Sequence, residues 1–302
     1  MTLTALLAAI FPPGFFANTP VLSALIVGGG AAIVSAVVGV FTVMRGQSFA
    51  GHALADVSSA GGSASFLLGV SPLWGFTGMA MIAGAALGVA DLRDARERDL
   101  LTGIVLGAGL GLAALFLYFD ITSMSTSGAA VTILFGSMFS IPTSIIPLTL
   151  SVGAGAITAV AVIYRPLLVS SLSPELAEAL GIRTRLIGLA HVLALSWAVA
   201  LSAMTIGAIL STALLIGPAA TGLRLADRPG RAVILSVAIG LAATWGGILL
   251  AYDSFYWTPG HGWPVSFFIV TLVLLFYLTA ALLARQGSSK GKGPTGSRRP
   301  RV

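Results

Sequence analysis

The stretch LLTGIVLGAGLGLAALFLYF, residues 100–119, contains no Asp, Glu, Lys, Arg or His in 20 consecutive positions. An α-helix of about 20 apolar residues is long enough to cross the roughly 30 Å hydrocarbon core of a bilayer. Charged residues stand immediately before this stretch, at Arg98 and Asp99, and immediately after it, at Asp120. The stretch therefore predicts a transmembrane helix.

The whole chain has the composition of a membrane protein. Of its 302 residues, 57% are hydrophobic and 9% are charged, against roughly 25% charged in an ordinary soluble domain. No polar segment is long enough for a separate soluble domain, so we interpret residues 1–285 as one transmembrane domain. Residues 286–302 are rich in Gly, Ser, Lys and Arg, which predicts a disordered basic tail that rests on anionic membrane lipid.

Similar apolar runs recur along the chain between short polar breaks. We expect an all-α, polytopic membrane protein with about nine transmembrane helices, eight and ten being the neighbouring counts. The expected spans are residues 21–44, 47–70, 73–92, 100–119, 144–164, 186–203, 206–223, 232–252 and 265–284.

The basic residues are confined to alternate ends of these spans. All 16 Lys and Arg fall at Arg45, in residues 93–98, 165–185 and 224–231, or in the tail from Arg285. With nine spans these places share one side, which the positive-inside rule makes cytoplasmic. We predict the N-terminus outside, the C-terminus inside, and a multi-pass location in the cell (inner, cytoplasmic) membrane. The positive charge thus indicates topology, and we expect no nucleic-acid partner.

The sequence lacks the motifs of several enzyme classes. It contains no Cys, which excludes disulfides, thiolate metal sites and cysteine nucleophiles. The phosphate loop G-x-x-x-x-G-K-[ST] is absent, so the chain is not expected to hydrolyse ATP itself. H-E-x-x-H and G-x-S-x-G are absent too. We expect neither an enzyme nor a permanently bound cofactor.

Three ionisable residues lie well inside the expected spans: His52, Asp56 and His191. A charge in hydrocarbon costs several kcal/mol unless it is paired or hydrated, so such residues are functional candidates. Counted from Arg45 at about 1.5 Å per residue, His52 lies about 10 Å and Asp56 roughly 16 Å into the membrane. Asp56 is then near the midplane. His191 fits a packed histidine better than a ligand.

The spacing of His52 and Asp56 places both side chains on one face of a helix. Imidazole nitrogen and carboxylate oxygen together suit a divalent ion such as zinc, manganese or iron(II). On the residues alone, two other interpretations remain open. In the first, the two side chains satisfy each other as a buried hydrogen-bonded pair at a helix interface. In the second, they relay protons.

A second candidate feature is SLSPELAEALGIRTR, residues 171–185, on the predicted cytoplasmic side. Ser173 fits the N-cap of a short helix, Pro174 its first position, and Glu175 its positive end. Gly181 fits the residue that stops the helix. The pattern predicts a helix of about two turns outside the membrane.

This short helix has an apolar side. Leu176 and Leu180 share a face with Ala177, which predicts a small apolar knob able to enter a groove of a partner protein. An ordinary interfacial loop helix is the alternative.

Six segments follow one another in a recognisable order. They are VVGVFTVMRGQSFAGHALADVSSAGG (37–62), ERDLLTGIVLGAGLGLAAL (97–115), ILFGSMFSI (133–141), SPELAEALGI (173–182), IGAILSTALLIGPAATGLRLA (206–226) and YWTPGHGWPVSFFIV (256–270). Together they resemble the membrane permease subunits of ABC transporters for zinc, manganese and iron, the ABC-3 family. The resemblance covers about residues 15 to 280.

The resemblance implies a permease subunit that forms the translocation path of an ATP-driven importer for zinc, manganese or iron. It implies three partners: a cytoplasmic ABC ATPase subunit that uses ATP, an extracellular or periplasmic metal-binding protein, and a second permease copy in a homodimer or paired permease. It makes His52 and Asp56 metal ligands. His191, from its position inside a span, is a candidate for an additional pathway residue. The resemblance also implies that one segment couples the permease to its ATPase. The residues of this segment are Pro174, Glu175, Leu176, Ala177, Leu180 and Gly181.

The chain departs from the family pattern at the metal pair. The family usually shows Asp followed four residues later by His, whereas this chain has His52 and then Asp56. Both ligand types stay on one helix face, so the metal interpretation holds while the metal preferred is left open. Two alternative functions are a proton-coupled secondary metal transporter and an ABC permease for a metal chelate.

Overall fold

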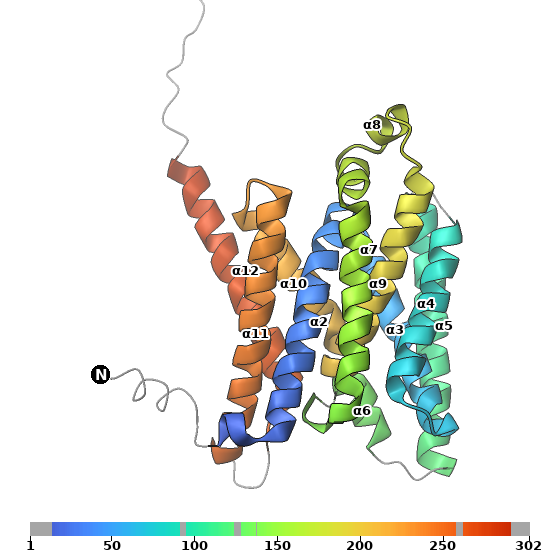
Figure 1. The fold of residues 1–302 in the computed structure, drawn as a ribbon, viewed down its shortest axis with the longest axis vertical. Coiled ribbons are helices and arrows are strands. Elements are labelled where there is room, and N and C mark those ends of the chain that lie inside the picture. Colours follow the sequence, from blue (N-terminus) through green and yellow to red (C-terminus); the bar gives the residue numbers. More distant parts are fainter. Residues whose placement is uncertain (1–13, 91–94, 124–127, 137, 258–261, 291–302) are drawn as a thin grey trace, which may run out of the picture.

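The computed structural model describes residues 14–90, 95–123, 128–136, 138–257 and 262–290. These residues form helices joined by short turns, without a strand among them, and the long helices run alternately up and down in one bundle (Figure 1). In chain order the elements are η1 (Phe15–Ala17), α2 (Thr19–Met44), α3 (Ser48–Leu68), α4 (Pro72–Ala90), α5 (Ala95–Ser123), α6 (Ala129–Phe135), η2 (Met138–Ser140), η3 (Thr143–Ile145), α7 (Ile146–Leu172), α8 (Pro174–Ala179), α9 (Thr184–Ile206), α10 (Ala208–Leu225), α11 (Pro229–Trp257) and α12 (Val265–Lys290).

The prediction of an all-α membrane protein is confirmed. Within the described residues, eight helices are long and apolar enough to cross a membrane, namely α2, α4, α5, α7, α9, α10, α11 and α12. The other long helix, α3, occupies the expected span 47–70 and has 21 residues. Its sequence is rich in Ser and Gly and contains the His52–Asp56 pair, which makes it less apolar than its neighbours.

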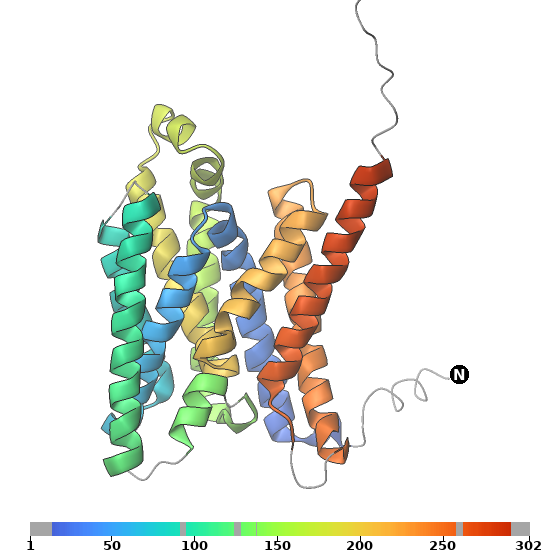
Figure 2. The same ribbon diagram turned by 180° about the vertical axis from the view of Figure 1, so that it is seen from behind.

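The α3 helix lies inside the bundle. It contacts α4, α5, α9 and α10, and seen from behind it lies between α5 and α10 (Figure 2). Gly61 of α3 faces Gly75 of α4 backbone to backbone, and Gly109 of α5 lies against the backbone of Val57. Because small residues let helices approach closely in lipid, these contacts fix α3 on two sides.

A single residue, Gly207, separates α9 from α10, close to the boundary between the expected spans 186–203 and 206–223. Gly207 has φ 90°, a backbone conformation that glycine adopts at little cost. It lies against Gly136, which follows α6 with φ 78°, so closely that a Cβ on either glycine would meet backbone atoms beside the other. The end of α6 therefore meets the start of α10.

The expected spans 100–119 and 144–164 leave residues 120–143 as a loop between them, and this prediction is wrong in part. The α5 helix continues to Ser123, and the short helix α6 and the 3₁₀ turn η2 follow. At 7 residues, α6 is far too short to span a bilayer, so a search for spans of about 20 residues passes over it.

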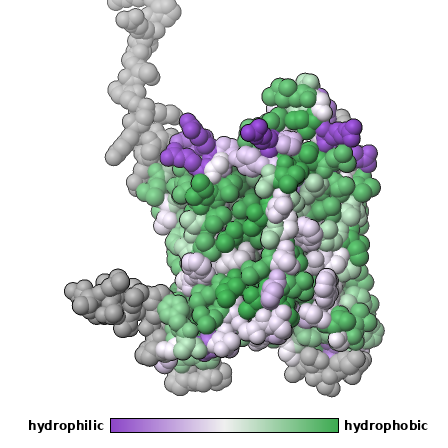
Figure 3. All heavy atoms as spheres, in the orientation of Figure 1, coloured by the Kyte–Doolittle hydropathy of each residue, from purple (hydrophilic) through white to green (hydrophobic). Residues whose placement is uncertain are grey.

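Hydrophilic residues gather at the end of the molecule that carries α8, whereas the middle of the same face is largely apolar (Figure 3). Because the long helices alternate in direction, this end also holds Arg45 at the end of α2, Arg98 in α5 and Arg224 in α10. The one-sided distribution of basic residues is thus seen in the fold. Which side faces the cytoplasm stays a prediction.

The α12 helix continues through Lys290, into the segment expected to be a disordered tail. The rest of that segment, residues 291–302, lies outside the described residues. The division at residue 285 stays a prediction.

Candidate metal site

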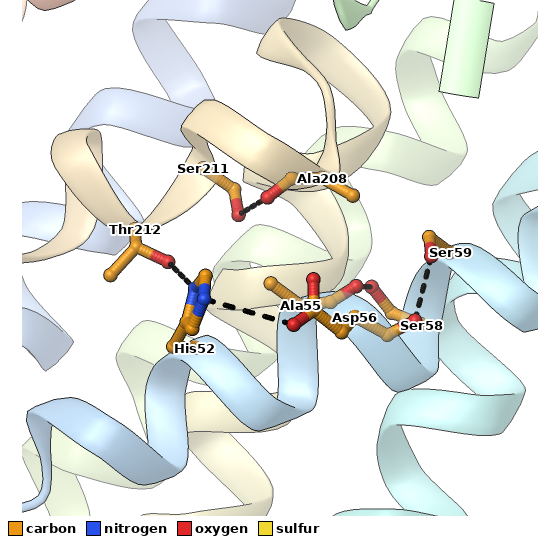
Figure 4. A network of polar contacts seen from close by, with 8 residues as sticks. All are labelled: His52, Ala55, Asp56, Ser58, Ser59, Ala208, Ser211 and Thr212. Atoms are coloured by element: carbon orange, nitrogen blue, oxygen red, sulfur yellow. Dashed lines mark hydrogen bonds and ion pairs between the residues drawn. The ribbon is translucent and has the colours of Figure 1, made fainter. Parts of the chain in front are cut away.

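His52 and Asp56 lie one turn apart on α3 and point to the same side of it (Figure 4). Nε2 of His52 is 3.8 Å from Oδ2 of Asp56. The side chain of His52 is 42% exposed in the single chain, and that of Asp56 is 7% exposed. The carboxylate is therefore inside the bundle, and the imidazole stands at its margin.

The distance between the two side chains can be compared with the lengths of a hydrogen bond and of metal–ligand bonds. A direct hydrogen bond between nitrogen and oxygen needs about 2.7–3.2 Å, so the 3.8 Å between Nε2 of His52 and Oδ2 of Asp56 is longer than a hydrogen bond. A zinc ion binds imidazole nitrogen and carboxylate oxygen at about 2.0–2.2 Å each. A separation shorter than the sum of two such bonds is one that a single metal ion can bridge.

A third side chain orients the imidazole. Nδ1 of His52 is 3.1 Å from Oγ1 of Thr212 on α10 (Figure 4). Metal-binding histidines usually donate the second ring N–H to such a partner, which fixes the tautomer and turns the other nitrogen toward the metal. If Nδ1–H donates to Thr212, the lone pair of Nε2 faces the Asp56 carboxylate. The imidazole nitrogen and the carboxylate oxygen are then two acceptors that face each other, and a cation fits between them.

Sequence reasoning missed Thr212. The residue is separated from His52 by 160 positions, and the sequence gives no local signal for a contact between α3 and α10. The one signal in the sequence that could have indicated Thr212 is its position in the segment IGAILSTALLIGPAATGLRLA, residues 206–226, which resembles the family.

The backbone around the pair is reinforced by hydroxyl groups. Ser59 Oγ donates to the carbonyl of Asp56 at 2.6 Å, and Ser58 Oγ donates to the carbonyl of Ala55 at 2.7 Å. On α10, Ser211 Oγ donates to the carbonyl of Ala208 at 2.8 Å. Each of these serine hydroxyls donates to a backbone carbonyl of its own helix and not to the side chain of His52 or Asp56.

The described part of the chain holds no group of three or more His, Cys, Asp or Glu side chains able to bind a metal. One chain therefore offers His52 and Asp56 as two strong ligands. Further ligands have to be supplied by Thr212, water or another molecule.

His191 does not join the pair in such a group. It is fully buried on α9, where its Nε2 is 3.4 Å from Oγ1 of Thr42 and its ring meets Phe41 edge-on at 6.5 Å between centroids. These surroundings are those of a packed histidine between α2 and α9. A role for His191 in the pathway stays a prediction.

The expected short helix is present as α8, and its caps are those that the sequence indicates. The side chain of Ser173 accepts a hydrogen bond from the Leu176 N–H at 3.3 Å, and Pro174 is the first helical residue. Gly181 has φ 74°, and the following Ile182 N–H donates to the carbonyl of Ala177 at 3.0 Å. This bond closes the helix end.

The apolar knob of α8 consists of two leucines. Leu176 is 54% exposed and Leu180 is 64% exposed. Ala177, expected on the same face, is fully buried, and α8 contacts α7 and α9. Ala177 therefore belongs to the side of α8 that faces its own chain, and the two leucines are exposed. The α8 helix itself lies at one end of the bundle (Figure 1).

The sequence pattern of the ABC 3 transport family matches residues 18–283, which include the pair, Thr212 and the whole of α8. The chain belongs to the ABC 3 transport family. It is a multi-pass membrane permease of this family, as the resemblance of its six segments predicted.

Individual members of the ABC 3 transport family match over most of the chain. The manganese transport system membrane protein MntC of Listeria innocua is 27% identical over 264 residues, which are 87% of this chain and 91% of that protein. The high-affinity zinc uptake system membrane protein ZnuB of Haemophilus influenzae is 26% identical over 239 residues, 76% of this chain and 88% of that protein.

A solved structure shares the fold. PsaBC from Streptococcus pneumoniae, in complex with Fab, contains a chain that is 27% identical to this one and superposes with a TM-score of 0.79. The match covers 94% of this chain and 99% of that one. The whole bundle, and not only one part of it, is therefore shared with that chain.

Proposed function

We propose that this chain is the permease subunit of an ATP-driven importer for divalent transition metal ions, and that His52 and Asp56 bind the ion during its passage. The observation that carries this proposal is the separation of 3.8 Å between Nε2 of His52 and Oδ2 of Asp56 on a helix inside a membrane bundle. The names of MntC and ZnuB support metal as the substrate, and leave manganese, zinc and iron open.

The ion is bound at the margin of the chain and shared with a second permease copy. His52 is 42% exposed although it belongs to a helix in the bundle, so its ring is accessible to another molecule. A second copy adds a second imidazole and a second carboxylate, which together complete a set of four nitrogen and oxygen ligands suited to zinc or manganese. Such a site has to release its ion again, so moderate affinity is expected.

ATP hydrolysis takes place in a separate cytoplasmic ATPase subunit. The present sequence has no phosphate loop, and α8 presents Leu176 and Leu180 at the end of the bundle. We place these leucines in a groove of the ATPase, with Pro174, Glu175, Ala177 and Gly181 as the residues that shape and hold the coupling helix. An extracellular or periplasmic metal-binding protein delivers the ion to the opposite end.

The end that carries α8 is the cytoplasmic one in this proposal. Arg45, Arg98 and Arg224 stand at this end, and the positive-inside rule assigns such an end to the cytoplasm. The N-terminus is then outside and the C-terminus inside. The coupling helix and the basic residues thus give the same orientation.

Transport by the chain together with its ATPase in liposomes tests the function. We expect accumulation of manganese or zinc that requires ATP and the metal-binding protein, and that survives a proton ionophore. Accumulation that collapses with the proton gradient and ignores ATP would support a secondary transporter instead. Uptake of a metal chelate without competition from free metal would support a chelate permease.

A further inference from the structure

A cavity of about 360 Å³ lies at the α8 end of the bundle, and neither His52 nor Asp56 lines it. Its walls come from six places: the end of α2, the start of α3, the end of α4, the first turns of α5, α8, and the first turns of α9. Arg45, Gln47, Arg98 and Thr102 supply polar groups on its wall. The proposed function assigns no role to this cavity.

The guanidinium of Arg45 makes a hydrogen bond through Nη1, while its Nε has no hydrogen-bond partner. Its Nη1 donates to Oγ of Ser170 at 3.0 Å, and its Nη2 lies against Gly188 of α9, where a side chain would come within 3.4 Å. Its Nε is buried without a hydrogen-bond partner, and so is Oε1 of the nearby Gln47. A buried donor without a partner is costly, which points to a missing acceptor.

A second guanidinium faces the same cavity. Arg98 lines it together with Arg45, and the pKa of Arg45 is lowered by burial and by the charge of Arg98. Among the described residues, neither arginine has a carboxylate within 4.0 Å. Within the part of the chain that the structure describes, two neighbouring positive charges are thus left without a bound counter-ion.

Helix dipoles add to this positive potential. Arg98 is in the first turn of α5, and the first turn of α9 also lines the cavity through Thr184 and Arg185. The N-terminus of a helix carries positive partial charge, which disfavours a cation and favours an anion. Arg185 donates a hydrogen bond to the carbonyl of Val89 at 3.1 Å. Arg98 donates to no such helix-end carbonyl among the described residues.

The acidic residues of the cavity lie on one wall. Glu175 and Glu178 belong to α8, and Glu178 accepts a hydrogen bond from Oγ1 of Thr184 at 3.4 Å. A ligand complementary to this cavity would place an anionic group near the arginines and hydrogen-bond donors near the glutamates. A phosphate ester that also carries hydroxyl groups has this chemistry.

We propose that this cavity binds the phosphate group of a membrane phospholipid, with Arg45 and Arg98 as its ligands and the rest of the head group toward α8. The location supports a lipid as the source, because hydrophilic residues border the apolar belt at this end of the molecule (Figure 3). Guanidinium groups bind phosphate through strong, charge-assisted hydrogen bonds. The lipid would sit directly behind the coupling helix.

The test uses the full chain, purified in detergent and stripped of lipid, with tryptophan fluorescence as the measure of thermal unfolding. The probe is dioctanoyl phosphatidylglycerol, and dioctanoylglycerol, which lacks the phosphate, is its matched control. We expect the phospholipid to raise the Tm of the wild type in a saturable way and the control lipid to leave it unchanged. Inorganic phosphate is titrated in parallel.

Variants locate the effect. Arg98→Gln is expected to raise the apparent Kd for the phospholipid about tenfold or more, and Arg45→Lys, which keeps the charge but loses the planar fork, is expected to raise it as well. Arg231→Gln removes an exposed arginine from the same end, outside the cavity, and should bind as the wild type does. The Tm of each variant without lipid reports whether it is folded.

Equal apparent Kd values for the wild type, Arg98→Gln and Arg45→Lys would overturn the site. Equal stabilisation by phosphatidylglycerol and dioctanoylglycerol would overturn the role of the phosphate. Stabilisation by inorganic phosphate that matches the lipid at the same concentration would contradict the lipid as the source. None of these outcomes concerns metal transport, so the proposed function is tested separately.

Discussion

The imidazole of His52 is oriented by a different helix from the one that carries it. Its Nδ1 is 3.1 Å from Oγ1 of Thr212 on α10, while its Nε2 is 3.8 Å from Asp56 on its own helix. Movement of α10 relative to α3 would therefore change the orientation of this imidazole. In the proposed function, the contact would link a rearrangement of the bundle to metal affinity.

Replacement of Thr212 tests this contact. Thr212→Val removes the hydroxyl and keeps the shape, so we expect metal uptake at limiting concentration to fall about 10- to 100-fold, the usual cost of losing such a supporting partner. Thr212→Ser should retain most of the uptake. Ser211→Ala is the matched control, because Ser211 bonds only to the carbonyl of Ala208 in the described contacts. Equal uptake by Thr212→Val and wild type would remove Thr212 from the site.

The orientation can be tested with single cysteines, since the chain has none of its own. Val70 lies in the turn between α3 and α4 at one end of the bundle, and Asp227 lies between α10 and α11 at the other. We expect Val70→Cys to react with an impermeant thiol reagent in intact cells, and Asp227→Cys only after permeabilisation. The reverse pattern would place α8 outside the cell.

The coupling role of α8 predicts a selective loss of the ATPase partner. Leu176→Asp or Leu180→Asp would bury an unpaired charge in the proposed groove, at a cost of several kcal/mol, so co-purification of the ATPase should fall at least tenfold. Leu225→Asp is the control, because Leu225 is 44% exposed at the same end but belongs to α10. Undiminished recovery of the ATPase with both α8 variants would argue against coupling through these leucines.

The close approach of α3 and α4 predicts a strong effect of one methyl group. Gly61→Ala places a Cβ against the backbone of Gly75, so we expect thermal stability in detergent to fall, by about 1–3 kcal/mol for overpacking. Gly78→Ala on α4 is the control, since a Cβ there has open space around it. Equal unfolding temperatures for the two variants would show that α3 and α4 separate easily.

Much of the bundle was predictable because hydrocarbon imposes a length and an apolar composition on every span. The reasoning failed where that constraint is absent. The α6 helix has 7 residues and is too short to cross the bilayer. The α7 helix runs to Leu172, although its span was expected to end at residue 164. Helices continue beyond the bilayer when their own caps, such as Ser173, allow it.

The site was predictable to the extent that it is local. His52 and Asp56 are one turn apart, and helix geometry alone places them on one face. Thr212 was missed because its contact depends on how α10 packs against α3. Ala177 was assigned to the exposed face of α8, but the packing of α8 on α7 and α9 buries it, and periodicity in so short a helix does not tell which side faces inward.

The measurement that tests the central proposal most directly is metal uptake per assembled complex for four proteins. These are the wild type, His52→Ala, Asp56→Ala, and the double variant His52→Asp with Asp56→His, each assayed with radioactive manganese and zinc. Assembly is scored by recovery of the permease with its ATPase, so that a folding defect is separated from a transport defect.

We expect the two alanine variants to assemble and to lose uptake, and the double variant to keep measurable uptake because one nitrogen and one carboxylate remain within a helical turn. Loss of assembly in the alanine variants would indicate a structural pair, whose broken partner leaves a buried polar group unsatisfied. Normal uptake of both metals by assembled His52→Ala and Asp56→Ala would contradict the metal site.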